Sequence, residues 1–412
     1  MGSRSLACLL PKELVPQMRA LAETVWRLVR RDRSQTAVHL ISKVLGELDL
    51  TNPESAAQAK EQRAYLLNLR GVIHAQRSQN DESLSDLQAA HRELPAWPVP
   101  LYNLGLSYKQ YRRWSEAAEV LEQAVSCIRR PGSRFAIPVA AQNTGLSRAI
   151  LWNLAIAMTA VGRTAVAREA WQSCGVTVPR TPGGDLGLAQ LSLPTQGPYS
   201  IERVWVQRLD PARARILSVV RYGAPCQFGD IVLVDSSSYQ TGYSDGLQSS
   251  ESEESETEES SNGLIFLDAM ESAGYVLHVV QGGPATPGQA MALTERMREA
   301  GLHIEVWSLT MRLPGTTQTP ESTADDRGTP LCAGLVLPTG AFSSPAARWP
   351  ETETAISHLD STHVAERAIT TLKLASSELS VPLFAPTLMA ASGDELGAAR
   401  HRKALRRGSG SR

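Results

Sequence analysis

The sequence predicts a multidomain α and α+β protein, in which an N-terminal α-solenoid of stacked helical hairpins precedes an α+β domain. Two observations predict this division. Apolar residues recur with helical spacing through the first half, whereas apolar and polar residues alternate with a period of two after residue 199. A third observation, a long acidic run in the second half, predicts a disordered insertion between strands of a small mixed sheet.

The first helices are expected over residues 1–63, as a degenerate repeat or as a cap. Leu21, Val25 and Leu28 recur at helical spacing in one amphipathic segment, and a second such segment follows it. A cap is the alternative because the terminal repeats of an array otherwise expose an apolar face.

The central helical region contains a pattern of small and large residues. Leu104-Gly105 is followed by Tyr108 on one helix, and Ala117 and Leu121 follow on the next helix. Small residues at Gly105 and Ala117 are expected to let the two antiparallel helices approach closely. The large side chains are expected to fill the space between neighbouring hairpins.

This pattern recurs on both sides of the central copy. Gly71 lies 34 residues before Gly105, and a third copy carries Ala155 after an inserted loop over residues 130–145. The pattern resembles that of the tetratricopeptide repeat family, whose period is 34 residues. The resemblance implies that residues 64–178 form TPR-like repeats, which stack into a curved surface for a protein or peptide partner.

The first helix of each hairpin is expected to line the concave face of this array. Exposed aromatic and aliphatic side chains there would anchor a partner, and asparagines would hydrogen-bond its backbone. The alternative is that the second half of the chain covers these positions. The candidate groove residues are Tyr102, Asn103, Leu106, Lys109, Gln110, Trp152, Asn153 and Ile156.

The composition changes after the repeats. Residues 179–198 are rich in Pro and Gly, so a linker is expected there. An α+β domain is expected over residues 199–345, beginning with a hairpin that turns at Asp210-Pro211. Its acidic loop, residues 236–262, contains no Lys or Arg and is expected to be disordered because it cannot bury enough apolar surface.

A strand–helix–strand unit is expected after the acidic loop. Thr286 and Gln289 have the spacing of a capping box at the start of a helix, and Pro287 suits the first helical position. This unit is typical of a ferredoxin-like α+β sandwich. The last two segments are expected to be a helical segment and a basic tail, over residues 346–396 and 397–412.

The motifs favour a protein-interaction scaffold or adaptor over an enzyme. The sequence shows no nucleophile elbow, phosphate loop, dinucleotide fingerprint or spaced set of metal ligands, so we expect no catalytic residue, no metal site and no cofactor. His358 and His363 lie five residues apart, a spacing that points two helical side chains in different directions. The open alternative is an enzyme or small-ligand sensor in residues 199–396, with the repeats as a docking arm.

The second half offers little further evidence of function. Segment Val204–Asp230 and the strand–helix–strand stretch that ends at Glu305–Ser308 resemble uncharacterised bacterial tetratricopeptide proteins, and this resemblance implies no activity. We do not expect a nucleic-acid partner, since the net charge is only −1. No apolar run approaches the length that a bilayer requires, and the five cysteines are widely spaced, so no membrane association and a cytoplasmic location are expected.

Overall fold

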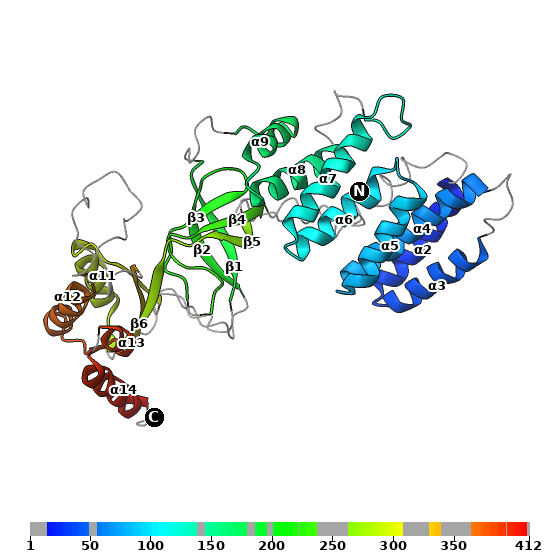
Figure 1. Cartoon of the computed structure of the whole chain (residues 1–412). Helices are drawn as coiled ribbons and strands as arrows, with labels where there is room; N and C mark the ends of the chain where they lie inside the picture. The colour runs from blue at the N-terminus through cyan, green and yellow to red at the C-terminus, as the bar shows by residue number, and fades with distance from the viewer. Residues whose placement is uncertain are drawn as a thin grey trace, which may run out of the picture. The chain divides into compact units, whose positions relative to one another are not determined.

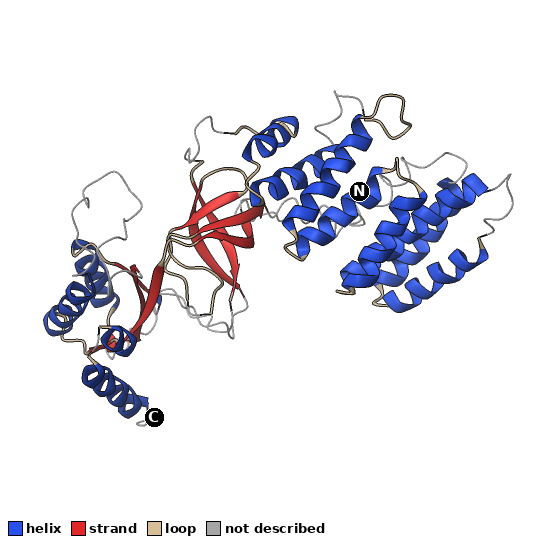
Figure 2. Cartoon of the chain, viewed as in Figure 1, coloured by secondary structure: helices blue, strands red, loops and turns tan. Residues whose placement is uncertain are grey.

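The computed structural model describes residues 15–48, 56–137, 145–178, 186–195, 201–221, 223–236, 263–307, 329–338, 364–392 and 394–409. The chain divides into two compact units. The first contains residues 1–186, 209–213 and 233–268, and the second contains residues 187–208, 214–232 and 269–412. Helices occupy the described part of the chain up to Ser173, and the strands all follow (Figure 2).

The first unit contains a series of helical hairpins (Figure 1). Consecutive helices pair closely, α2 with α3, α4 with α5, α6 with α7 and α8 with α9. The helices are α2 (Val15–Arg30), α3 (Ser34–Glu47), α4 (Ala56–Gln76), α5 (Asn80–Glu93), α6 (Pro98–Gln110), α7 (Trp114–Arg129), α8 (Gly145–Ala160) and α9 (Thr164–Ser173).

All four hairpins turn through the same backbone geometry. One residue in each turn is left-handed, with φ of 56°, 57°, 56° and 75° at Asp32, Ser78, Arg112 and Gly162. The amide of the following residue donates to the carbonyl five positions back, as in Arg33 to Leu28 (2.9 Å) and Arg163 to Met158 (2.8 Å). This 6→1 bond closes a Schellman motif. The α2–α3 hairpin shares this turn geometry with the three hairpins that follow it.

Two glycines allow the paired helices to approach closely. A Cβ atom placed on Gly105 would lie 2.5 Å from Cγ of Leu121, and one on Gly71 would lie 2.8 Å from Cγ of Leu87. Both leucines are fully buried, so they have little room to move. The small-on-large contacts predicted from the sequence are thus present, and the N-terminal half is a TPR-like helical array.

A small β-barrel follows the array in sequence. Its strands close in the order β1-β2-β3-β4-β5. They are β1 (Leu188–Pro194), β2 (Ile201–Arg208), β3 (Arg213–Ile216), β4 (Ile231–Ser236) and β5 (Leu264–Glu271). The linker expected over residues 179–198 therefore contains a strand, since Leu191 and Leu193 of β1 are buried inside the barrel. Of the expected acidic loop, residues 237–262 lie outside the described residues.

The expected hairpin after residue 199 is present as β2 and β3, which pair antiparallel with Val206 opposite Ile216. The carboxylate of Asp210 shapes its turn by accepting the amides of Ala212 (2.9 Å) and Arg213 (2.7 Å). This side-chain cap explains why the Asp-Pro pair is a reliable turn signal.

The second sheet has the order β7-β8-β6-β9 and belongs to the second unit. In chain order its elements are β6 (Tyr275–Ala285), α11 (Pro287–Glu299), β7 (His303–Val306), β8 (Thr329–Pro338), α12 (Val364–Glu378) and β9 (Leu383–Phe384). A strand–helix–strand unit thus occurs twice, with β8 antiparallel to both β6 and β7. This is ferredoxin-like topology, as the sequence pattern predicted.

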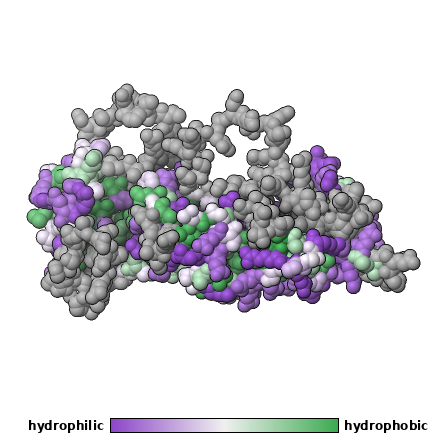
Figure 3. All heavy atoms as spheres, turned by 90° about the horizontal axis from the view of Figure 1, so that it is seen from above, coloured by the Kyte–Doolittle hydropathy of each residue, from purple (hydrophilic) through white to green (hydrophobic). Residues whose placement is uncertain are grey.

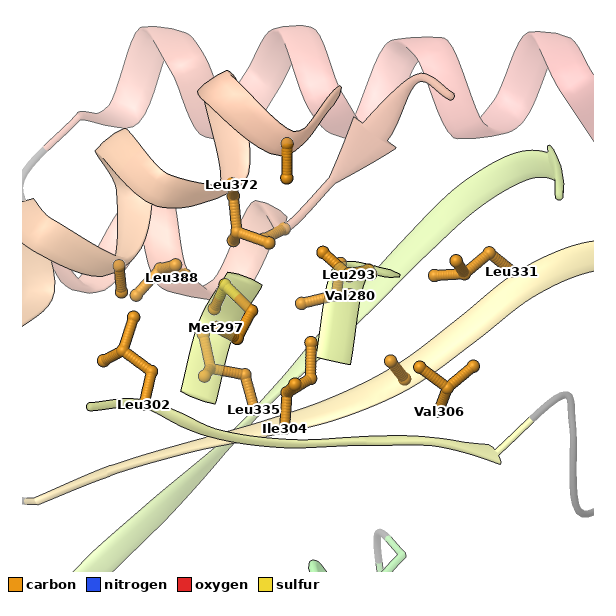
Figure 4. Packing of buried hydrophobic residues seen from close by; sticks show 14 of the residues in the cluster. Val280, Leu293, Met297, Leu302, Ile304, Val306, Leu331, Leu335, Leu372 and Leu388 are labelled. Atoms are coloured by element: carbon orange, nitrogen blue, oxygen red, sulfur yellow. The ribbon is translucent and has the colours of Figure 1, made fainter. Parts of the chain in front are cut away.

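The core of this sheet lies under its helices. Leu293 and Met297 of α11 and Leu372 of α12 pack on Leu335 of β8 (Figure 4). The expected capping box is present at Thr286, whose hydroxyl accepts the amide of Gln289 (3.3 Å) while the Gln289 side chain accepts the amide of Thr286 (2.8 Å).

Two boundaries differ from those expected. Residues 199–345 contain strands of two sheets instead of one. The expected C-terminal helical segment, 346–396, contains strand β9 of the second sheet and helix α12, which packs on that sheet. The chain continues as α13 (Pro386–Ala391) and α14 (Glu395–Ser409), so the described part of the basic tail is helical. His358 and His363 lie outside the described residues.

The surface is mixed in character. Hydrophilic and hydrophobic side chains alternate over the described part of the face seen in Figure 3. Among the described helices, none has the length and apolar character needed to cross a membrane.

Candidate functional site: the inner face of the repeats

The first helices of successive hairpins touch one another, α2 with α4, α4 with α6 and α6 with α8. Such contacts place them on the inner side of a repeat array. The position six residues before each left-handed turn residue is equivalent in every hairpin, and it lies on these first helices. The residues at this position, called here the inner row, are Trp26, Val72, Leu106 and Ile156.

The inner row is open at one end and covered at the other. Trp26, Val72 and Leu106 are half-buried, whereas Ile156 is completely buried. Gln76 and Gln110, two residues before their turns, are exposed beside the row. A partner could therefore reach apolar side chains in the first three hairpins but not in the fourth.

An aspartate from the barrel occupies the covered end. The Asp235 carboxylate lies 2.6 Å from the ammonium of Lys109 and accepts the indole N–H of Trp152 at 2.9 Å. The same ammonium donates to the side-chain oxygen of Asn153 (2.9 Å). Asp235 is 2% exposed, so this ion pair is shielded from water and its geometry is more constrained than that of a surface pair.

A second aspartate of the barrel is bonded by the same two kinds of donor, a tryptophan indole and a basic side chain. Asp268 of β5 accepts the indole N–H of Trp114 (2.8 Å) and pairs with the guanidinium of Arg112 (2.9 Å). Arg112 also lies over the ring of Phe266, 5.6 Å from its centroid. All these residues belong to the first unit. Strand β4 is thus attached through Asp235 to the third and fourth hairpins, and strand β5 is attached through Asp268 to the third.

The structure brings only some of the predicted groove residues together. Lys109, Trp152 and Asn153 meet around Asp235, which supports the alternative that the chain itself covers this part of the face. The remaining predicted residues are distributed as follows: Leu106 half-buried, Gln110 exposed, and Tyr102, Asn103 and Ile156 buried.

The predicted asparagines bond within the array. Asn103 donates to the side-chain oxygen of Asn68 (2.8 Å), which links α6 to α4. Asn153 donates to the carbonyl of Ala149 (2.9 Å). Both amides are nearly buried, so these bonds stabilise the helices in place.

Sequence reasoning missed the carboxylates that complete the array. Asp235 and Asp268 each end an apolar strand segment beside the acidic run, and this was the only signal for them. Asp86 accounts for Arg70 and His74, which stand where the central copy of the pattern has Leu104 and Tyr108. Its carboxylate receives two bonds of 2.7 Å from Arg70 and lies 3.7 Å from His74. The bond to Asp86 raises the pKa of Arg70.

A polar cluster in the second unit has a structural explanation. Glu305 of β7 accepts the amide of Val219 (2.9 Å), and the indole of Trp307 donates to the Val219 carbonyl (3.2 Å). Burial raises the pKa of Glu305. The Trp307 ring lies over Gly334, where a Cβ would be 2.3 Å from the ring. These contacts hold segment 217–221 on the sheet face opposite the helices.

The described residues form neither a metal-binding cluster nor a recognisable catalytic pair. They contain no group of three or more His, Cys, Asp or Glu side chains that could hold a metal ion. A surface groove of about 470 Å³ lies between α7, α8 and α9, and its floor includes Leu151 and Leu154. It contains Arg129 and Glu169 but no nucleophile paired with a base.

Solved structures of MamA resemble a part of this chain. A crystal structure of MamA is similar, with 15% identity, a TM-score of 0.23, and 36% of this chain and 90% of that chain covered. Two crystal forms of MamA AMB-1 give 13% and 14% identity, TM-scores of 0.22, and 38% of this chain covered, with 88% and 95% of those chains. No protein-family model and no curated protein matches the sequence. At these identities and scores, the likeness supports no statement about function.

Proposed function

We propose that the chain is a protein-interaction scaffold or adaptor, and that it binds a helical or extended segment of a partner along the inner row. The observation that carries this proposal is that one equivalent position holds a partly exposed apolar side chain in three successive hairpins, although Trp26 also packs against the core of the first hairpins. Trp26, Val72 and Leu106 are each half-buried there, on three successive first helices. Successive apolar contacts of this kind suit an amphipathic segment laid along a groove.

The covered end of the row defines the extent of the proposed site. Asp235 occupies the position between Lys109, Trp152 and Asn153, so a partner would bind the first three hairpins and stop at the barrel. Of the residues expected from the sequence, Leu106 and Gln110 remain the best candidates for direct contact. The others are proposed to fix the shape of the face.

The setting of this activity is proposed to be the cytoplasm. Cys127, Cys174, Cys226 and Cys332 are free thiols in the described part of the chain, which is compatible with a reducing compartment.

The experiment compares proteins that co-purify with the full chain and with three variants, measured by quantitative mass spectrometry. Leu106→Glu places a charge on the inner row, and Gln110→Arg changes an exposed position that folding does not need. Gln123→Glu, an exposed change on the second helix α7, is the matched control.

A partner of the inner row should be recovered with the control and reduced about tenfold or more with both groove variants. Circular dichroism should show that Gln110→Arg leaves the helices intact. Recovery of the same proteins in the same amounts by all four chains would contradict the proposal.

A further inference from the structure

The outward side of the barrel strands β1, β2 and β3 carries large apolar side chains in water. Val204 and Val206 of β2 face the barrel interior, so Trp205 between them faces outward and is 52% exposed. Leu188 on β1, Ile201 on β2 and Leu217 after β3 are 66%, 62% and 38% exposed. Leu217 is opposite Trp205 on the neighbouring strand and Leu188 is diagonal to it, and a contiguous apolar patch of this kind marks an interaction surface more often than scattered apolar residues do.

Two arginines flank the tryptophan. Arg203 lies two residues before Trp205 on β2 and therefore on the same side, about 7 Å away. On the neighbouring strand, the Leu217 amide donates to the Trp205 carbonyl (2.9 Å), and Arg215 is opposite Gln207. Arg215 is then a diagonal neighbour of Trp205, about 7–8 Å away. The Trp205 face is defined as Leu188, Ile201, Arg203, Trp205, Arg215 and Leu217.

The charges on this face are not already neutralised. Of the nearby arginines, Arg213 pairs with Asp210 and Arg221 pairs with Glu202 of β2. Arg203 and Arg215 form no such ion pair with any residue that the structure describes. The strand register places no Asp or Glu at the outward positions of β1 and β2. An acidic group approaching this face would therefore meet two available guanidinium groups.

The backbone of Trp205 is held in place before any partner arrives. Its amide donates to the hydroxyl of Ser218 (3.0 Å), and its carbonyl accepts the Leu217 amide, so the backbone is fixed on the β3 side. On the other side, Gln190 of β1 is its cross-strand neighbour. A rigid aromatic residue loses little entropy on binding, and Trp and Arg are the residues most enriched at the centres of interfaces.

Three occupants can be compared by their chemistry. A second copy of this chain, related by a twofold axis, would gather Arg203 and Arg215 of both copies in one interface without supplying carboxylates from this face, which is unfavourable. A single-stranded nucleic acid would stack on Trp205, but two cations give it little electrostatic affinity and Leu188 and Ile201 would stay exposed. A peptide with large apolar side chains and carboxylates satisfies both features of the face.

We propose that the Trp205 face binds an acidic peptide segment of a partner protein, with an apolar side chain of that peptide packed on Trp205 and Leu217 and its carboxylates on Arg203 and Arg215. The barrel is closed, so recognition uses side chains and not the addition of a strand. This surface is separate from the inner row of the repeats, and either proposal can fail without the other.

The test is a selection of random twelve-residue peptides displayed on phage against the full chain, with the Trp205→Ala chain as counter-selection. Trp205 is largely exposed, so its replacement should leave the fold unchanged, which circular dichroism checks. The matched control is Met291→Ala, a change of a 67% exposed apolar residue on α11 in the same unit.

Selected peptides should be enriched in Asp and Glu together with large apolar residues. Synthetic versions should bind at least tenfold more weakly to Trp205→Ala and to Arg203→Glu, and equally to Met291→Ala. The proposal is overturned if no Trp205-dependent peptide is recovered, or if such peptides are basic. It is also overturned if a dT12 oligonucleotide binds more tightly than they do, or if Trp205→Ala converts a dimer into a monomer in sedimentation.

Discussion

The close approach of the paired helices can be tested by adding one carbon atom. In Gly105→Ala, the new Cβ would lie 2.5, 2.7 and 3.0 Å from three side-chain carbons of Leu121, which is fully buried. Overpacking of this kind in a core costs about 1–3 kcal/mol. Replacing a helical glycine by alanine gains up to about 1 kcal/mol, so the net destabilisation should be about 1 kcal/mol.

The matched control is Gly46→Ala in α3. A Cβ on Gly46 meets no atom within 4 Å, so this variant keeps the gain in helix propensity without the steric cost. The free energy of unfolding of the two variants should therefore differ by about 1–3 kcal/mol, with Gly46→Ala the more stable. Guanidinium denaturation followed by far-ultraviolet circular dichroism measures this difference.

A second background separates steric cost from other effects. Leu121→Ala alone should cost about 2–5 kcal/mol because it leaves a cavity against Gly105. In that background, Gly105→Ala fills space instead of overfilling it, so its effect should change sign and become stabilising. If Gly105→Ala is as stable as Gly46→Ala in the natural background, the steric account of the hairpin is wrong.

Three further predictions concern other parts of the chain. Ser78→Gly should stabilise the array by up to about 1 kcal/mol because glycine adopts the left-handed conformation without strain. Gly162→Ala should destabilise it by roughly 1–2 kcal/mol for the opposite reason. Both free energies of unfolding are measured by denaturation, and changes of the same sign would contradict the turn geometry. Asp235→Ala should destabilise the first unit by roughly 3–5 kcal/mol, because it leaves the nearly buried ammonium of Lys109 without its carboxylate. Hydrogen exchange in β4 should become faster. Unchanged exchange would show that the contact is absent in solution. Burial lowers the pKa of His278 to about 4. As the pH falls from about 6.5 to 4, the unfolded chain therefore takes up a proton at this histidine before the folded chain does. Roughly 3 kcal/mol of the free energy of unfolding is lost over this range. His278→Gln should flatten that loss in denaturation experiments across this pH range, and the exposed His39→Gln should not.

The helical array could be predicted because its determinants are local. Gly71 and Gly105 lie one repeat apart, and each contacts a leucine sixteen residues later in the same hairpin. The start of α11 could be predicted for the same reason, since the capping box of Thr286 and Gln289 and the following Pro287 lie within four residues. An element can be predicted from sequence when the residues that determine it all lie within one hairpin or at one end of a helix.

The barrel and the covered end of the inner row could not be predicted in this way. Strand β1 lies in a segment whose Pro and Gly content is typical of a linker, and its pairing with β2 depends on a distant closure. The partner of Lys109 is Asp235, 126 residues further along the chain. No local pattern specifies such a pair, so the expected groove included positions that the chain itself fills.

The central claim is that the first helices of the hairpins form the surface that binds a partner. Hydrogen exchange of the full chain, measured alone and with a co-purified partner, tests it directly. The account predicts slower exchange in α4 and α6 around Val72 and Leu106, with α5 and α7 unchanged. Slower exchange confined to α5 and α7 would contradict it.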